Sequence, residues 1–134
     1  MKSKIWIGII IAIVLTFTGI SYAGPGPDFI PQDFEVGLQL ATALPVCVAH
    51  GFDIRDALRM DMQHPELREW YAFVEDQFFS GDQVTVNLVY HFTLLGYHMR
   101  TGAKESAISL LRSIMASDDF AWLVKMYQYG APSV

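Results

Sequence analysis

Apolar residues recur every three or four positions through most of the chain after residue 30, which is the spacing of amphipathic helices. The clearest example starts at Pro65, because proline is favoured at the first helical position, and ends near Gly81, a typical helix stop. One face of this helix carries Leu67, Trp70, Tyr71, Val74 and Phe78. Glu66 and Glu69 place negative charge near the positive end of its dipole. The pattern therefore predicts a well-defined amphipathic helix.

The other predicted helices also have recognisable ends. Pro31 starts the first, which we expect to end or kink at Pro45 because proline cannot donate a backbone hydrogen bond. Asp53 and Ser117 are good N-caps for the second and the last helix. Residues 82–100 and 103–116 form two more, whose short connection predicts antiparallel neighbours. The apolar face of the first helix contains Phe34, Leu38 and Ala41, and that of the helix after Asp53 contains Ile54, Leu58 and Met62. The apolar face of 82–100 contains Val84, Leu88, Phe92, Leu95 and Met99, and that of 103–116 contains Ala107, Leu110, Leu111 and Ile114.

Two segments also show features of strands. Apolar and other residues alternate over 34–40, and β-branched residues are frequent over 84–90. The uninterrupted length of 82–100 is ordinary for a helix and long for a strand, which favours the helical interpretation. We therefore predict an all-α, compact bundle of five or six short helices, with an α+β fold containing strands near 34–40 and 84–90 as the alternative.

The first 23 residues have the organisation of a secretory signal peptide. Lys2 and Lys4 precede an uncharged stretch, and Ser21 and Ala23 provide small residues for a cleavage site. An uncleaved membrane anchor is the alternative, since the uncharged stretch is close to the roughly 20 residues that span a bilayer. The Gly-Pro repeats that follow disfavour a continuing helix. We expect 1–23 to be a cleaved signal, 24–30 an extended linker, and 31–134 a single helical domain.

Charge narrows the range of partners. The chain carries nine basic and fourteen acidic residues, and loss of Lys2 and Lys4 with the signal leaves a formal charge of −7. The remaining basic residues are scattered singly along the sequence. This balance argues against binding to nucleic acid or to an anionic membrane surface. We expect the mature form to be periplasmic or secreted and not bound to a membrane.

Cys47 is the only cysteine, so it has no partner for an intramolecular disulfide. Its neighbours are apolar, which predicts a buried and slowly reacting thiol. Cys47 with His50, His91 and His98 is a weak candidate for a zinc site, since the two later histidines are about 10.5 Å apart along a helix. Met60, Met62 and His64 are weak candidates for copper ligands, because thioether and imidazole groups suit that metal.

The last helix is apolar on almost all sides. Phe120, Leu123, Val124 and Tyr127 form one stripe, and Trp122, Met126 and Tyr129 form another. We expect the first stripe to face the bundle and the second to bind a partner protein, because clustered exposed aromatics are typical of interfaces.

Motifs of common catalytic sites are missing from the sequence. The chain contains no Gly-x-Ser-x-Gly, no His-Glu-x-x-His and no glycine-rich phosphate loop. We expect no enzymatic activity, metal or cofactor, and predict non-catalytic protein binding in the cell envelope by an adaptor, an inhibitor or an accessory subunit of an envelope machine. A periplasmic copper or small-ligand carrier and an enzyme of unrecognised type are the alternatives, and homo-oligomerisation is left open.

Overall fold

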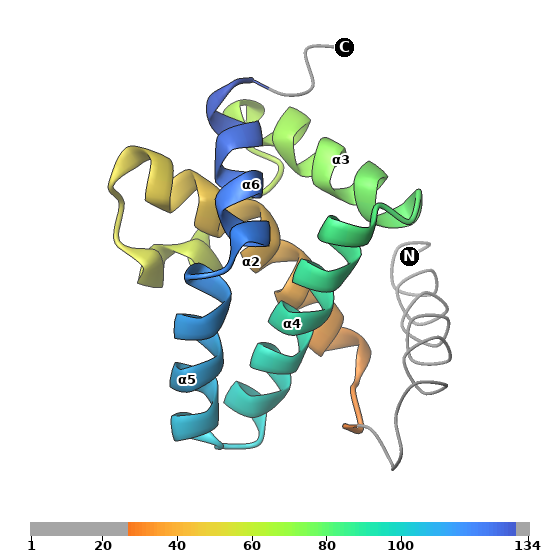
Figure 1. The fold of residues 1–134 in the computed structure, drawn as a ribbon, viewed down its shortest axis with the longest axis vertical. Coiled ribbons are helices and arrows are strands. Elements are labelled where there is room, and N and C mark those ends of the chain that lie inside the picture. The colour runs from red at the N-terminus through yellow and green to blue at the C-terminus, as the bar shows by residue number, and fades with distance from the viewer. Residues whose placement is uncertain (1–26, 131–134) are drawn as a thin grey trace.

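The computed structural model describes residues 27–130. Within that range the chain forms five α-helices and one 3₁₀-helix and contains no strand (Figure 1). The all-α prediction is therefore confirmed, and both segments considered as strands, 34–40 and 84–90, are helical. The predicted signal peptide, residues 1–23, and the first part of the predicted linker lie outside the described residues.

Helix α2 (Pro31–His50) is the central element of the bundle. It packs most extensively against α4 (Gln83–Arg100) and also contacts the 3₁₀-helix η1 (Ile54–Arg59), α3 and α6. Two glycines allow the close approach of α2 and α4. A Cβ atom on Gly37 would lie 2.8 Å from the backbone nitrogen of Thr93, and one on Gly96 would lie 3.2 Å from the Val36 side chain. The crossing of α2 and α4 therefore depends on residues without side chains.

The sequence predicts that the helix starting at Pro31 ends or kinks at Pro45. Helix α2 does not end there but continues through the proline to His50. Pro45 is buried, and the residues from Leu40 to Cys47 around it are buried as well. The indole Nε1 of Trp70 donates a hydrogen bond of 2.8 Å to the carbonyl oxygen of Thr42, in the turn before the proline. Pro45 lacks the amide that would bond the carbonyl of Ala41, four residues earlier, and burial of apolar surface on all sides of this part of α2 offsets that loss.

The remaining helices begin and end near their predicted limits. They are α3 (Pro65–Phe79), α5 (Lys104–Met115) and α6 (Asp118–Gln128). The Ser117 side chain accepts a hydrogen bond from the amide of Phe120, which confirms it as the N-cap of α6. Helices α4 and α5 lie side by side and antiparallel, joined by a short turn, and α6 follows above α5 (Figure 1). No described helix is long and apolar enough to cross a bilayer.

The segment after Asp53 differs from its prediction. Asp53 does act as an N-cap, but the helix that follows is a six-residue 3₁₀-helix rather than an α-helix. Ile54, Leu58 and Met62 therefore do not form one buried stripe: Met62 is buried, whereas Ile54 and Leu58 are 38% and 43% exposed. The α-helical spacing assumed for these three residues does not apply once the chain leaves the helix at Met60.

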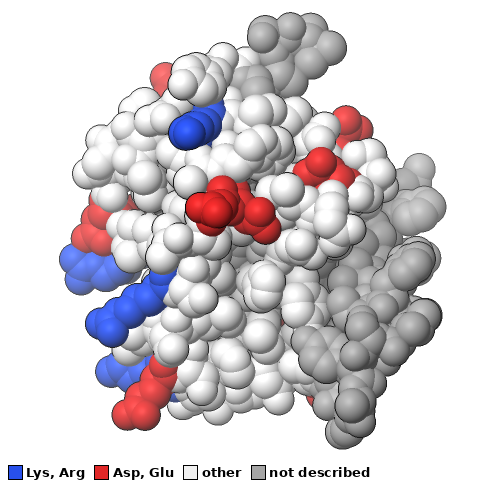
Figure 2. Space-filling view, in the orientation of Figure 1, with Lys and Arg blue, Asp and Glu red and all other residues white. Residues whose placement is uncertain are grey.

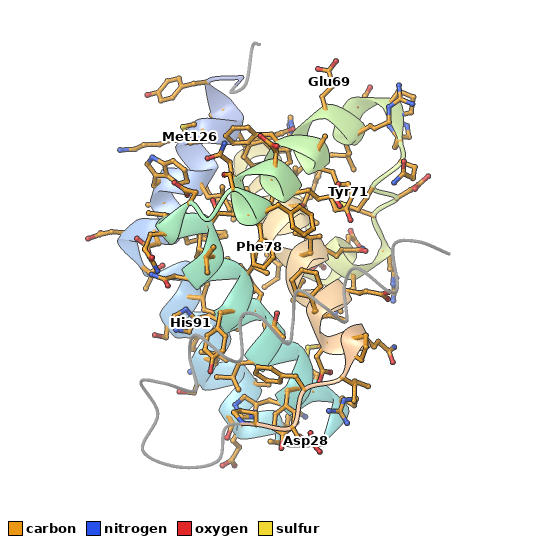
Figure 3. The ribbon with its side chains drawn as sticks, turned by 90° about the vertical axis from the view of Figure 1, so that its right-hand side faces the viewer. Asp28, Glu69, Tyr71, Phe78, His91 and Met126 are labelled. Atoms are coloured by element: carbon orange, nitrogen blue, oxygen red, sulfur yellow. The ribbon has the colours of Figure 1, made fainter. Side chains whose placement is uncertain are left out.

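An ion pair joins the start of α2 to the end of α4. The Arg100 guanidinium donates hydrogen bonds to both carboxylate oxygens of Asp33, with Nε at 2.9 Å and Nη2 at 3.0 Å. The same Nη2 reaches the backbone oxygen of Asp28, which lies at this end of the molecule in Figure 3. Asp33 is almost fully buried, and it also accepts from the amide of Ile30. The segment before α2 is therefore held against the bundle.

Candidate functional site

The described residues form an apolar groove of about 410 Å³. Four elements form it: α2, η1, α4 and α5. We call this feature the η1–α5 groove. Its apolar lining consists of Leu40, Leu44, Ile54, Leu58, Leu95, Met99, Ala107, Ile108 and Leu111, and its other lining residues are Arg55, His98, Gly102 and Lys104.

The wall formed by η1 is held in place by hydrogen bonds from α2. The side-chain amide of Gln39 donates to the backbone oxygens of Ala57 and Met60, each at 3.1 Å. Ala57 is fully buried against the bundle. Because these contacts anchor one side of η1, the side chains of Ile54 and Leu58 border the groove instead of filling the core.

Exposed apolar residues are concentrated at the groove. Ile54, Leu58, Met99 and Ile108 are four of the nine large apolar residues that are exposed in the described part of the chain, and all four line it. They come from three separate elements, η1, α4 and α5. Single exposed apolar side chains are ordinary, whereas a set that converges on one concavity marks a surface that an apolar group can cover.

Basic side chains border this side of the molecule. In Figure 2 most of the visible Lys and Arg side chains gather along the left edge, over η1 and α5, with acidic side chains beside some of them. Arg55 is paired with Asp53 through Nε and Nη2, and these hydrogen bonds hold the pKa of Asp53 at about 2. Lys104 has no ion-pair partner among the described residues. The rim therefore carries one uncompensated positive charge.

The three residues predicted to bind a partner on α6 differ in their surroundings. Trp122 and Met126 are partly buried and pack against the core, so the bundle covers this stripe more than its sequence suggests. Figure 3 views the molecule from the side of α3 and α4, and Met126 is labelled on α6 at the upper left. Tyr129, immediately after the helix, is 80% exposed. Of the stripe predicted to face the bundle, Phe120 and Leu123 are buried, and Val124 and Tyr127 are partly buried and pack against the core.

Tyr127 connects α6 to the end of α2. Its hydroxyl lies 2.8 Å from Nε2 of His50, and its ring packs edge-on against Trp70 at a centroid distance of 5.3 Å. The His50 ring also stacks on Phe52, with ring centroids 5.2 Å apart. Burial raises the pKa of Tyr127. These contacts give His50 a structural role, because they hold α6 against the end of α2.

The three weak candidates for copper ligands, Met60, Met62 and His64, lie in different surroundings. Met62 lies in the core, Met60 is partly buried, and His64 is exposed. The Nδ1 atom of His64 accepts a hydrogen bond of 3.2 Å from the amide of Glu66, so this nitrogen serves as the N-cap of α3. Within residues 27–130, no group of three or more His, Cys, Asp or Glu side chains lies close enough together to hold a metal ion.

Cys47 and the three histidines proposed with it do not form a metal-binding group among the described residues. Cys47 is fully buried in α2, as its neighbours predict, and burial raises the pKa of its thiol, with Asp56 and Asp53 adding to the effect. His50 is engaged with Tyr127, His91 is exposed on α4, and His98 lines the η1–α5 groove. The thiol is thus held in the core, away from solvent.

Comparisons with protein-family models, with curated proteins and with solved structures find no match to this chain. Its function must accordingly be inferred from its own residues and their arrangement. The η1–α5 groove is the candidate site, because its volume and its lining residues are defined.

Sequence reasoning did not find the groove, although two signals for it are present. Four of the seven residues from Asp53 to Arg59 are charged, so few positions remain for an apolar face that could be buried. Met99 lies at the very end of its helix, next to Arg100, where the stripe leaves the core. Neither signal identifies the opposing wall, which comes from α5, far along the chain.

Proposed function

We propose that this chain is an exported, non-catalytic binding protein and that the η1–α5 groove is its principal binding site. The observation that supports the proposal is the convergence of Ile54, Leu58, Met99 and Ile108 on one groove of about 410 Å³. This volume lies in the range of sites that hold small molecules or the apolar end of a larger one. Covering the exposed side chains removes apolar surface from water, which favours binding by about 25 cal/mol per Å².

The proposal keeps the non-catalytic character predicted from the sequence and develops the small-ligand alternative. The groove is bordered by apolar side chains, one paired arginine, one lysine and one histidine. None of the residues that line the groove carries a carboxylate, and most of them are apolar, which suits binding. The chemistry of this surface is that of recognition.

An environment-sensitive dye tests the groove directly. We expect anilinonaphthalenesulfonate to bind the native protein saturably with increased fluorescence, because the dye combines an apolar ring system with a negative charge. Leu58→Gln should weaken this binding about fivefold, since it replaces an apolar contact of roughly 1 kcal/mol. Phe79→Gln is the matched control, because Phe79 is also an exposed apolar residue, 50% exposed, but does not line the groove.

Two results would contradict the proposal. One is the absence of dye binding to protein whose cooperative thermal unfolding shows it to be native. The other is equal weakening by Leu58→Gln and Phe79→Gln, which would show that the dye is bound nonspecifically. Export is tested separately: the intact mass of protein recovered from the cell envelope should correspond to a chain beginning at Gly24. A full-length, membrane-bound species would contradict cleavage.

A partner protein docked at the end of α6 is a second candidate function. The observation that favours it is Tyr129, which is 80% exposed beside the partly buried Trp122 and Met126. Aromatic residues with one accessible face are frequent anchors in protein interfaces. This surface is separate from the η1–α5 groove, whose lining includes no residue of α6.

A further inference from the structure

We infer that the η1–α5 groove holds the hydrocarbon chain of a free fatty acid, with the carboxylate of the ligand at the rim beside Lys104. This inference rests on the proposed function, because it names the class of ligand for the same groove. Three observations support it: an apolar wall, a single uncompensated positive charge at the rim, and a small volume.

The wall determines the chemistry of the buried part of the ligand. Leu40, Leu44 and Leu95 are buried, and together with Ala107 and Leu111 they present no polar side-chain atom. A ligand hydroxyl or amide placed against them would lose its hydrogen bonds to water without replacement, which is strongly unfavourable. A saturated hydrocarbon chain has no such group. The wall therefore selects for an aliphatic chain rather than for a sugar, nucleotide or polar peptide.

The rim determines the charge of the other end of the ligand. The Arg55 guanidinium is already neutralised by Asp53, with Nη2 and Oδ2 in direct contact at 2.6 Å. Lys104 has no such partner in the described part of the chain, and His98 beside it makes no hydrogen bond there through its ring nitrogens. One ammonium group and one imidazole match a singly charged carboxylate better than a doubly charged phosphate.

The size of the groove favours a free ligand over a macromolecule. A groove of about 410 Å³ has the volume of a small-molecule site. A stable protein interface instead buries about 800 Å² of surface on each partner. The chain as a whole is acidic, with a formal charge of −5, and this charge opposes adsorption to an anionic lipid surface. A monomeric fatty acid is small enough for this volume, and Lys104 at the rim attracts its single negative charge locally.

Calorimetric titration with decanoate, dodecanoate and dodecanol, all kept below the concentrations at which they aggregate, tests this inference. We expect dodecanoate to bind one to one and about tenfold more tightly than decanoate, because two more methylene groups are buried. Lys104→Met should weaken the binding of dodecanoate about two- to fivefold and leave that of dodecanol unchanged. Lys125→Met is the control, since Lys125 is an exposed cation on α6 outside the groove, and it should affect neither ligand.

The outcomes separate this inference from the proposed function. If dodecanol binds as tightly as dodecanoate and Lys104→Met changes neither, the groove binds aliphatic chains but the carboxylate assignment is wrong. If the dye binds at the groove while neither aliphatic ligand does, the proposed function stands and the fatty acid is wrong. Binding to phosphatidylglycerol vesicles without binding of monomeric dodecanoate would identify a membrane surface as the occupant and overturn the inference. Dodecanoate binding that Leu58→Gln does not weaken would contradict both proposals.

Discussion

The indole nitrogen of Trp70 on α3 donates a hydrogen bond of 2.8 Å to the backbone oxygen of Thr42 on α2. Thr42 precedes Pro45 by three residues, in the turn where the proline ring interferes with regular helical hydrogen bonding. The ring of Trp70 also contacts Phe73 and Tyr127. A side chain of α3 thus bonds the backbone of α2 and also contacts α6.

Replacing Trp70 with phenylalanine tests this hydrogen bond. The substitution keeps an aromatic ring but removes the donor, so the buried oxygen of Thr42 loses a partner. We expect the free energy of unfolding to fall by about 1–3 kcal/mol, measured by chemical denaturation. Pro45→Ala restores a donor for the carbonyl of Ala41, not for that of Thr42, so the cost of Trp70→Phe should be unchanged in a Pro45→Ala background. A cost below about 0.5 kcal/mol would show that the hydrogen bond to Thr42 does not stabilise the fold.

The thiol of Cys47 should react slowly in the folded protein. It is fully buried, and its raised pKa lowers the fraction of thiolate at neutral pH, which is the form that reacts. Titration with a thiol reagent should therefore be slow in native buffer and fast in denaturant. Rapid labelling of the native protein, or a dimer that disappears on reduction, would contradict this prediction.

Tyr71 should remain neutral to unusually high pH. Burial and the neighbouring Glu75, which accepts a hydrogen bond from the tyrosine, raise the pKa of Tyr71 to about 12. Because the folded state retains this proton more strongly than the unfolded state, the associated stability is complete below the ordinary tyrosine pKa of about 10. It is lost as the pH rises from about 10 to about 12.

Because burial also raises the pKa of Tyr127, the titration is done in a Tyr127→Phe background, where tyrosinate absorbance should show one late step that Tyr71→Phe removes. The same variant should lose less of its stability between pH of about 10 and about 12 than the parent protein does. Figure 3 shows Tyr71 and Phe78 on α3, and Phe78 is buried against Phe34 of α2 with ring centroids 5.1 Å apart. A late titration step that persists in Tyr71→Phe would assign the raised pKa to another tyrosine.

Variants of α6 separate its core residues from its surface. Leu123 is buried, so Leu123→Ala should cost about 2–5 kcal/mol through the cavity it leaves. Tyr129 is mostly exposed, and Tyr129→Ala should change stability by less than about 0.5 kcal/mol. Thermal and chemical unfolding provide these values. If a partner docks here, Tyr129→Ala weakens its capture without unfolding the domain.

Trp122 decides how much of the predicted interface belongs to the core. Trp122 packs partly against the bundle, so the free energy of unfolding of Trp122→Ala should lie between those of Leu123→Ala and Tyr129→Ala. A loss as large as that of Leu123→Ala would make Trp122 a core residue and leave Tyr129 as the only one of the three predicted contacts still available to a partner.

Local signals were sufficient to predict most helices. Pro65 and Ser117 start helices where their chemistry predicts, and the turn after Arg100 separates α4 from α5. Of the two outcomes predicted at Pro45, the end of the helix is wrong and the kink stays a prediction, while the α-helix predicted after Asp53 is wrong. In the first case tertiary burial offset a local penalty. In the second, a 3₁₀-helix replaced the expected α-helix, so the assumed alternation of buried and exposed positions was incorrect.

The sequence by itself determined the all-α class of this protein, its lone cysteine among apolar neighbours and its acidic balance, and residues 27–130 do form helical segments without strands. These properties depend on caps, spacing and composition, which act within a few residues. Only the tertiary structure decided which apolar faces remain uncovered. Ile54 and Leu58 border a groove, and Trp122 packs against the bundle, because exposure depends on how helices distant in the chain approach one another. The periodicity of one helix identifies its apolar face but contains no information about the neighbour that covers it.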